Sequence, residues 1–222
     1  LCGKAYPSGK LSMTFPVAFA DHASSANFPL DIKEEIKLGG SNDNIADPVR
    51  TYHYTPYEED VFVGYRYFDS FDKPVSYPFG YGLSYTTFEY SNPVVRFDNG
   101  VYSVSVDVRN TGKRDGKEVV QLYVAAPDNK GANKPVKELK AFAKTSELKP
   151  GESETVNMTF SPAELASFNG DTNEWVVDEG TYNLLIGASS RDIRHKLDID
   201  VKGRKDKANP LFAVKTELNT LK

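Results

Sequence analysis

Three adjacent carboxylates, Glu58, Glu59 and Asp60, precede a segment rich in aromatic residues. Cleavage of a glycosidic bond uses two carboxyl groups that face one sugar, about 5–10 Å apart. Because adjacent residues of an extended segment point to opposite sides, this spacing does not suit such a pair and favours a solvated acidic loop. Asp198 and Asp200 share a strand face, but they alternate with apolar residues, so we expect them on the outer face.

Histidine, cysteine and serine offer little other chemistry. His22, His53 and His195 lack metal-binding spacings such as HxH or HxxxH, and Cys2 is the single cysteine, without a nearby His and Asn partner. The run Phe79–Ser84 has the wrong order for a G-x-S-x-G nucleophile elbow and no third glycine for a dinucleotide fingerprint. The sequence therefore predicts no catalytic residue, no metal ligand and no cofactor-binding residue in this chain.

Charge and composition exclude two classes of partner. The 222 residues carry 27 Lys and Arg against 31 Asp and Glu, a net charge of −4, without the basic excess of a nucleic-acid footprint. No apolar run approaches the roughly 20 residues that cross a bilayer, and the first ten residues lack a secretion signal. We expect neither a nucleic-acid nor a membrane partner.

Alternation of apolar and polar residues predicts the fold. It is clearest in five stretches, 102–108, 119–124, 155–160, 182–187 and 197–201, and weaker in 88–97, 139–145 and 175–177. Each strand is expected to have one buried and one wet face, and the run Ser161–Glu164 predicts one short helix. The prediction is an all-β fold: an antiparallel two-sheet immunoglobulin- or fibronectin type III-like sandwich with an irregular, aromatic-rich N-terminal extension.

The extension contains the densest aromatic segment. Tyr52–Tyr90 holds nine Tyr and five Phe. Such a segment suits a sugar-stacking platform or an adhesive surface against another domain, and composition does not separate the two. Before it, Asp31–Lys37 suits one or two helical turns; after the last strand, Gly203–Lys222 is a tail of uncertain order.

Several long motifs in a fixed order carry a resemblance. They are Tyr6–Leu11 (YPSGKL), Thr14–Pro16 (TFP), Tyr57–Asp69 (YEEDVFVGYRYFD), Tyr77–Tyr85 (YPFGYGLSY), Val119–Val124 (VVQLYV) and Leu148–Glu152 (LKPGE). Together they resemble the C-terminal part of family 3 glycoside hydrolases, the β-glucosidase and β-xylosidase group, including its fibronectin type III-like domain. The resemblance covers about residues 3–202.

In that family a barrel supplies an Asp nucleophile, an α/β sandwich domain supplies the Glu acid/base in many members, and the fibronectin-like domain comes last. The resemblance implies a C-terminal fragment whose parent hydrolyses terminal β-linked glucosides or xylosides with retention. Both catalytic elements would lie upstream, so the 222-residue chain alone is expected to be inactive. Family habit points to a periplasmic or secreted parent.

The resemblance also implies a domain plan. Residues 1–50 would be the remnant of the α/β sandwich domain, 51–87 an aromatic-rich interdomain connection, 88–202 the fibronectin type III-like domain and 203–222 a C-terminal tail. Two departures are visible: Asp60 stands where many relatives have Gly, and the tail lacks a clear counterpart.

We expect five residues to pack the connection against the upstream barrel and α/β domains: Tyr65, Arg66, Tyr67, Phe79 and Tyr81. Arg66, between two tyrosines, suits a stacked or bidentate buried role. Two alternatives stay open. One is a carbohydrate-binding module that holds an oligosaccharide on Tyr52–Tyr90 or on Tyr123. The other is a homodimer formed through the exposed aromatic segment.

Overall fold

A computed structural model of the chain describes residues 5–26, 58–127 and 134–208. Its elements, in chain order, are β1 (Phe15–Pro16), η1 (Phe19–Asp21), η2 (Ala23–Ala26), α1 (Tyr65–Ser70), β2 (Val75–Tyr77), β3 (Phe88–Asp98), β4 (Val101–Asn110), β5 (Val119–Ala125), β6 (Glu138–Lys144), β7 (Ser153–Phe160), η3 (Pro162–Leu165), β8 (Ser167–Asn169), β9 (Glu174–Val177), β10 (Gly180–Gly187), β11 (Ile193–Val201) and β12 (Arg204–Lys207). Cys2, His53 and Asp31–Lys37 lie outside the described residues.

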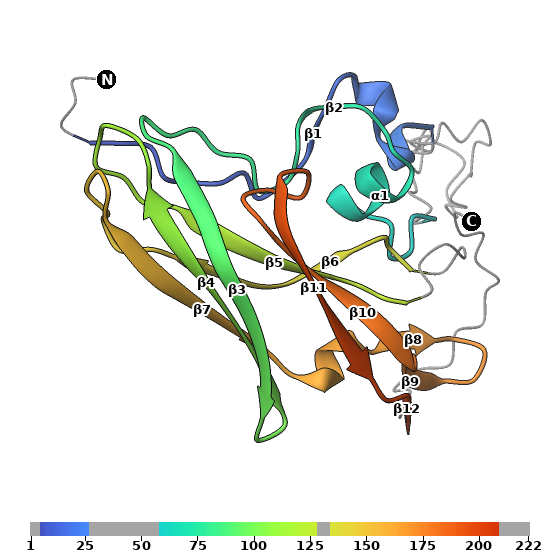
Figure 1. Cartoon of the computed structure of the whole chain (residues 1–222). Coiled ribbons are helices and arrows are strands. Elements are labelled where there is room, and N and C mark those ends of the chain that lie inside the picture. The colour runs from blue at the N-terminus through green and yellow to red at the C-terminus, as the bar shows by residue number, and fades with distance from the viewer. Residues whose placement is uncertain (1–4, 27–57, 128–133, 209–222) are drawn as a thin grey trace, which may run out of the picture.

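Two antiparallel sheets form the sandwich. One has the strand order β11-β10-β5-β6 and the other β3-β4-β7, and the sheets face each other across the core (Figure 1). The inward side chains of β4, β5 and β10 supply much of that core: Val104, Val106, Val108, Val120, Leu122, Leu184 and Ile186 are fully buried. The predicted all-β sandwich is therefore confirmed, and all eight predicted stretches are strands.

The corner before β10 is held by a tyrosine. The Tyr182 hydroxyl accepts a hydrogen bond from the Asp178 backbone N–H (3.1 Å) and lies 3.3 Å from the Asp178 carbonyl, to which it donates. This is the tyrosine corner of immunoglobulin-like sandwiches. Burial, followed by the charge of Asp178, raises the pKa of Tyr182 to about 12.

Short elements close the far end of the sandwich. The predicted helical turn is the 3₁₀ helix η3, where the Ser161 backbone N–H donates to Glu164 Oε1 (2.8 Å) and Leu165 is buried. Strand β12 pairs with β9, and β9 with β8, in a small third sheet. Residues 204–207 of the C-terminal tail thus form a strand.

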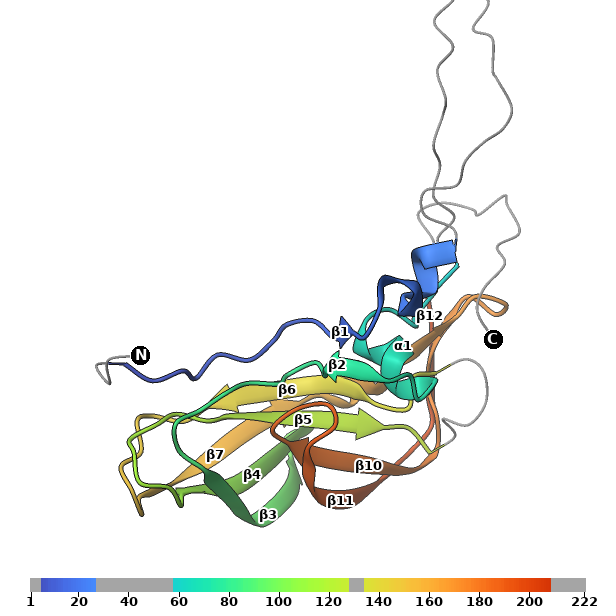
Figure 2. The same ribbon diagram turned by 90° about the horizontal axis from the view of Figure 1, so that it is seen from above.

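Strand β5 differs from the expected pattern of one buried and one wet face. Gln121 and Tyr123, on its outer face, are 3% and 0% exposed. The reason is a second layer: residues 5–16, here called the strap, and the segment from α1 to β2 run over the sheet that contains β5 and β6 (Figure 2). Alternation identified the strand, but it could not show that another segment covers the polar side.

Polar contacts fasten the strap. Lys10 Nζ lies 2.7 Å from Glu118 Oε1, and Lys144 Nζ donates to Ser8 Oγ (2.9 Å). The Tyr6 hydroxyl donates to the carboxylate of Glu147. Its backbone also pairs with the connection, because the Leu11 N–H donates to the carbonyl of residue 81 (2.8 Å). The strap and the connection therefore form one sheet-like cover.

Candidate docking surface

Helix α1 begins after Gly64, whose φ of +58° lies in the left-handed region. It presents Tyr65 to the sandwich. The Tyr65 ring stacks on Phe79 with centroids 4.6 Å apart and meets the edge of Tyr123 at 5.9 Å, while its hydroxyl accepts from the Leu139 N–H (2.8 Å). Burial raises the pKa of Tyr65. Two of the five predicted packing residues, Tyr65 and Phe79, therefore lie on the side of the connection that faces β5.

A buried carboxylate anchors the end of α1. Asp69, with a side chain 4% exposed, places Oδ1 2.7 Å from Arg191 Nε and Oδ2 3.2 Å from Lys137 Nζ. Arg191 Nη2 also donates to the carbonyls of Phe68 (3.1 Å) and Lys73 (2.7 Å). One guanidinium in the β10–β11 loop thus holds both sides of the helix end.

Gln121 ties the cover to two parts of the sandwich. Its Nε2 donates to the carbonyls of Gly80 (3.1 Å) and Ala188 (2.8 Å), and its Oε1 accepts from the Tyr123 hydroxyl (2.5 Å). Gly80 has a φ of +79°, and a Cβ there would lie 1.9 Å from Gln121 Oε1. Burial raises the pKa of Tyr123 well above its usual value. Tyr123 is therefore closed to a ligand, which overturns its proposed role in holding glycan.

Arg66 is partly exposed in this chain, and its expected buried role against the upstream domains stays a prediction. Its side chain is 39% exposed and makes one ion pair, Nη2 to Glu138 Oε1 at 2.8 Å. Its Nε is buried and finds no hydrogen-bond partner within the described ranges. Because Arg66 follows Tyr65 in α1, its side chain leaves the helix in a different direction and reaches Glu138 of the edge strand β6.

Tyr67 and Tyr81 lie in two clusters of rings farther out. Tyr67 contacts Phe68 and Phe71 at 5.3 and 5.2 Å, and Tyr81 contacts Tyr77 at 5.0 Å. Neither makes a ring contact with the sandwich that the structure records. The predicted five therefore divide between an inner and an outer layer.

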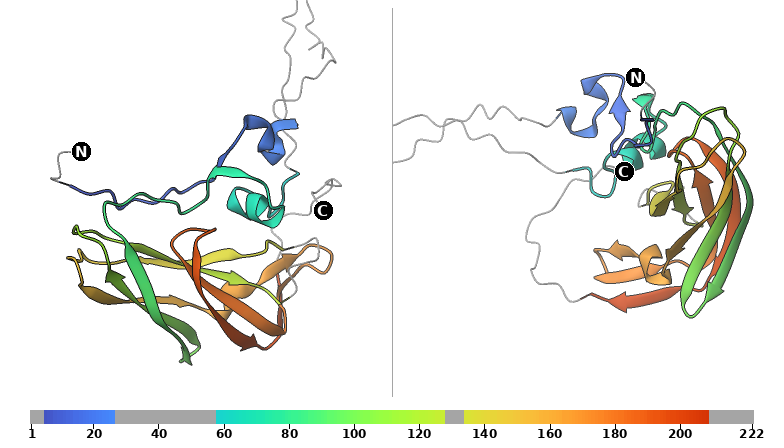
Figure 3. Two further views of the ribbon diagram at one scale, coloured as in Figure 1. Left: turned by 45° about the horizontal axis from the view of Figure 1, so that its top comes forward. Right: turned by 90° about the vertical axis from the view of Figure 1, so that its left-hand side faces the viewer.

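Beyond these rings the cover ends in exposed apolar side chains, which we call the outer apolar surface. Its members come from the strap, the residues that join it to η1, η1 itself, β2 and the turn before α1: Met13, Phe15, Val17, Phe19, Val63 and Tyr77. Phe19 is 71% and Val17 63% exposed, and the rings of Phe15 and Tyr77 meet edge to face at 6.4 Å. Figure 3 shows the strap, η1 and α1 on one side of the sandwich, away from the sheet β3-β4-β7. Sequence reasoning missed the strap members, because no periodicity marks them.

The acidic and histidine candidates fall elsewhere. Asp60 adopts a φ of +49° in a turn where the Phe62 N–H donates to the Glu59 carbonyl (2.8 Å). His22 packs edge to face on Phe68 at 5.8 Å, and His195 Nε2 lies 2.8 Å from a backbone carbonyl of β3. Asp198 and Asp200 are exposed as expected, bonded to Asn183 and Thr181 of β10.

No group of three His, Cys, Asp or Glu side chains that could hold a metal ion occurs within residues 5–26, 58–127 and 134–208. In the same ranges the longest helix is far too short to span a membrane.

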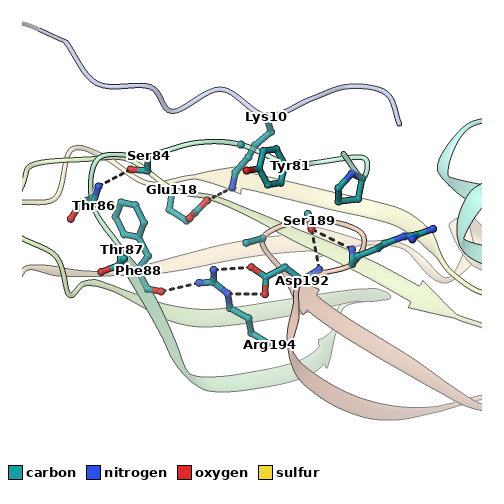
Figure 4. Close-up of a pocket in the computed structure, with 14 residues that line it drawn as sticks. Lys10, Tyr81, Ser84, Thr86, Thr87, Phe88, Glu118, Ser189, Asp192 and Arg194 are labelled. Atoms are coloured by element: carbon teal, nitrogen blue, oxygen red, sulfur yellow. Dashed lines mark hydrogen bonds and ion pairs between the residues drawn. The ribbon is translucent and has the colours of Figure 1, made fainter. Parts of the chain in front are cut away.

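One cavity of about 520 Å³ opens beside the strap (Figure 4). Its walls come from Lys10 of the strap, Tyr81 and Ser84 of the connection, Glu118 before β5, and the β10–β11 loop with Arg194. In Figure 4 Lys10 reaches down to Glu118, and Asp192 and Arg194 close the opposite wall. Sequence reasoning did not single out this cavity, because its residues are scattered along the chain from Lys10 to Arg194.

Comparison with known proteins gives the chain its family. Residues 118–190 match the model of the fibronectin type III-like domain. The thermostable β-glucosidase B of Acetivibrio thermocellus is 42% identical over 205 residues, covering 90% of this chain and 24% of that protein. β-glucosidase B of Emericella nidulans is 39% identical over 212 residues, with 92% and 23% covered.

Solved structures agree with the sequence matches. β-glucosidase 3B of Thermotoga neapolitana in complex with glucose aligns with a TM-score of 0.75 at 44% identity, over 93% of this chain and 26% of that one. The β-glucosidase of Kluyveromyces marxianus aligns with a TM-score of 0.73 at 37% identity, over 91% and 22%. The chain spans about a quarter of the length of these relatives. With its fibronectin type III-like domain, it belongs to the family 3 glycoside hydrolases of the β-glucosidase type, where it corresponds to the C-terminal part.

Proposed function

We propose that this chain is the non-catalytic docking and stabilising module of a β-glucosidase. The observation that carries the proposal is the outer apolar surface on a cover that is itself fixed to the sandwich. Large apolar side chains exposed together on one face mark an interaction site. The anchors described above, Arg191 with Asp69 and Gln121 with Gly80, hold that face in a defined position. A preformed surface loses little entropy when it docks.

The partner we propose for this surface is the upstream barrel and α/β domains of the same enzyme. In this domain plan, residues 1–50 are the end of the α/β domain, and residues 51–87 connect it to the fibronectin-like domain. That domain spans residues 88–202, and residues 203–222 follow as a tail. The outer apolar surface then lies on the first two of these parts, next to the chain that joins them to the upstream domains. Tyr67 and Tyr81, in the outer rings, would contact those domains, while Tyr65, Arg66 and Phe79 hold the connection on the sandwich.

The activity we propose for the whole enzyme is hydrolysis of terminal β-linked glucosides or xylosides with retention, through two carboxylates supplied by the upstream domains. The relatives' names as β-glucosidases support the substrate class. Glu58, Glu59 and Asp60 lie in a turn of this chain, where adjacent carboxylates do not face one sugar.

The direct test is hydrolysis of 4-nitrophenyl β-glucoside and β-xyloside by the 222-residue chain. We expect no turnover above background. Turnover that is lost in Glu58→Gln or Glu59→Gln would return the acidic run to the catalytic site and refute the proposal.

A homodimer through the same surface is the second candidate, because identical apolar faces can pack on each other. Sedimentation of the isolated chain over a range of concentrations separates the two. A dimer that persists in the presence of the upstream domains would contradict docking and support a homodimer formed through this surface.

A further inference from the structure

The cavity beside the strap has walls whose charges are already paired. Lys10 Nζ and Glu118 Oε1 lie 2.7 Å apart, with side chains 17% and 8% exposed. On the opposite wall, Arg194 Nη2 lies 3.0 Å from Asp192 Oδ2 and Nε lies 3.4 Å from Oδ1. The third cation of the lining, Arg191, is paired with Asp69 behind the wall (2.7 Å). Every charged group at the cavity therefore has a partner of opposite sign, and the cavity offers donors and acceptors together.

The wall around Arg194 is held rigidly. Besides Asp192, its Nη1 donates to the Phe88 carbonyl (2.9 Å), and its guanidinium lies 4.3 Å from the centroid of the Tyr90 ring. A guanidinium fixed on three sides keeps its remaining donor edge in one orientation. Beneath it, the buried Tyr90 hydroxyl finds no hydrogen-bond partner among the described residues. Burial, and next the charge of Glu118, raises the pKa of Tyr90.

Unused hydroxyl groups lie at the same cavity. Ser84 Oγ accepts from the Thr86 N–H (3.2 Å), and Ser189 Oγ accepts from the N–H groups of Arg191 (3.3 Å) and Asp192 (3.0 Å). Neither hydroxyl donates to another residue within the part of the chain that the structure describes. Each therefore keeps a donor for a ligand.

The remaining wall is apolar and partly aromatic. Tyr81, Phe88, Pro78 and Ala188 line it. The volume of about 520 Å³ lies within the range of small-molecule sites, which combine an apolar lining with a few fixed polar groups. A cyclic compound with several hydroxyl groups matches this lining, because its hydroxyl groups can bond to the polar wall and its C–H groups can pack on the apolar wall.

We propose that this cavity binds a neutral polyhydroxyl compound of monosaccharide size, with Glu118, Arg194 and the two serine hydroxyls as its polar contacts. The proposal rests on the proposed function only for the choice of D-glucose as the probe. It places a second sugar-binding site where the strap and the connection meet the fibronectin-like domain, separate from the carboxylates that cleave the substrate.

The test is a titration of the ¹⁵N-labelled 222-residue chain with D-glucose, followed by amide chemical shifts. For a ligand of this size we expect a dissociation constant on the order of 1–10 mM. Shifts should concentrate at Ser84, Ser189 and Asp192 and spare Trp175, which lies in the small third sheet. Shifts confined to other regions, or no shifts up to tenfold above that range, would refute the site.

A filling variant and a matched control sharpen the test. Ser84→Leu places a larger apolar side chain at the exposed rim of the cavity and should weaken glucose binding at least tenfold. Ser103→Leu makes the same change at an exposed position of β4, outside the cavity, and should leave binding unchanged. Equal binding by both variants would overturn the proposal.

A second probe distinguishes the ligand class. Inorganic phosphate at the same concentrations should produce no comparable shifts, because the three cations of the walls, Lys10, Arg191 and Arg194, are already paired with carboxylates. Phosphate shifts stronger than those of glucose would assign the cavity to anions and contradict a polyhydroxyl ligand. Neither result bears on docking, which involves the outer apolar surface.

Discussion

Arg191 Nε lies 2.7 Å from Asp69 Oδ1, and this contact joins two segments 122 residues apart in the chain. Asp69 lies near the C-terminal end of α1, within the connection, and Arg191 belongs to the loop between strand β10 and the edge strand β11. The pair, with Lys137 on the other carboxylate oxygen, makes the cover and the sandwich one unit. The proposed docking role depends on this attachment of the cover to the sandwich.

Replacing the Arg191 guanidinium tests whether it attaches the cover to the sandwich. Arg191→Met leaves Asp69 with Lys137 alone and removes two hydrogen bonds to backbone carbonyls, so we expect a loss of about 2–4 kcal/mol in the free energy of unfolding. Urea denaturation measures it. Arg204→Met breaks an ion pair whose side chains are 62% and 50% exposed, and the expected loss there is below about 1 kcal/mol. Equal losses would show that Arg191 does not anchor α1.

Two glycines with the same backbone angle test the covered face of β5. Gly80 and Gly100 both have a φ of +79°, but a Cβ at Gly80 would meet Gln121, whereas Gly100 has nothing within 4 Å. The strain of a left-handed alanine, about 1–2 kcal/mol, is common to Gly80→Ala and Gly100→Ala. We expect Gly80→Ala to be less stable than Gly100→Ala by at least about 2 kcal/mol, because Gln121 must move. Similar thermal midpoints would mean that Gln121 has room.

Asp60 invites the opposite substitution. It adopts a φ of +49°, a conformation that glycine accepts without steric cost. Asp60→Gly should therefore leave the chain as stable or raise its stability by up to about 1 kcal/mol. Asp171→Gly, in an exposed turn without a positive φ, should lower stability by about 0.5–1 kcal/mol. A marked loss in Asp60→Gly, measured by urea denaturation, would show that the carboxylate has a structural role.

Tyr182 predicts a loss of stability at high pH. Its folded pKa, about 12, lies above the unfolded value of 10.0, so its contribution is complete below pH 10 and is lost as the pH rises through 12. The expected slope is about 1.4 kcal/mol per pH unit for this residue. Urea midpoints between pH 8 and pH 12 measure the decline.

Tyr182→Phe should lower stability at pH 8 by about 1–2 kcal/mol, because the Asp178 backbone loses its partner, and should flatten the decline above pH 10. Tyr85→Phe, at a tyrosine 52% exposed, is the matched control and should leave the midpoint at pH 8 unchanged. A Tyr182→Phe profile parallel to that of the native chain would contradict the raised pKa.

Local patterns predicted the sandwich because the apolar residues of most strands alternate with polar ones, and this alternation marks the buried face. Val104, Val106 and Val108 alternate with polar residues, and all three are fully buried. Strand β12 was not predicted, because Arg204–Lys207 contains only charged residues and pairs at an edge where nothing must be buried.

The candidate site was less predictable because its contacts are long-range. The motif around Tyr65 pointed to packing, but neither the partner of Asp69 nor the burial of Tyr123 follows from neighbouring residues. The exposed Phe19 lies in η1, a single 3₁₀ turn after the strap, so it carries no periodic signal. A surface whose members are brought to one side of the sandwich only by folding cannot be located by spacing along the chain.

The most direct measurement of the docking role is association of this chain with the separately produced upstream domains of the proposed parent enzyme. Val17→Ser with Phe19→Ser alters the outer apolar surface, and Val94→Ser with Phe97→Ser makes the same changes at exposed positions of β3. We predict a one-to-one complex that restores hydrolysis of 4-nitrophenyl β-glucoside, weakened at least tenfold by the first pair and unchanged by the second. No complex, or equal weakening by both pairs, would contradict docking through this surface.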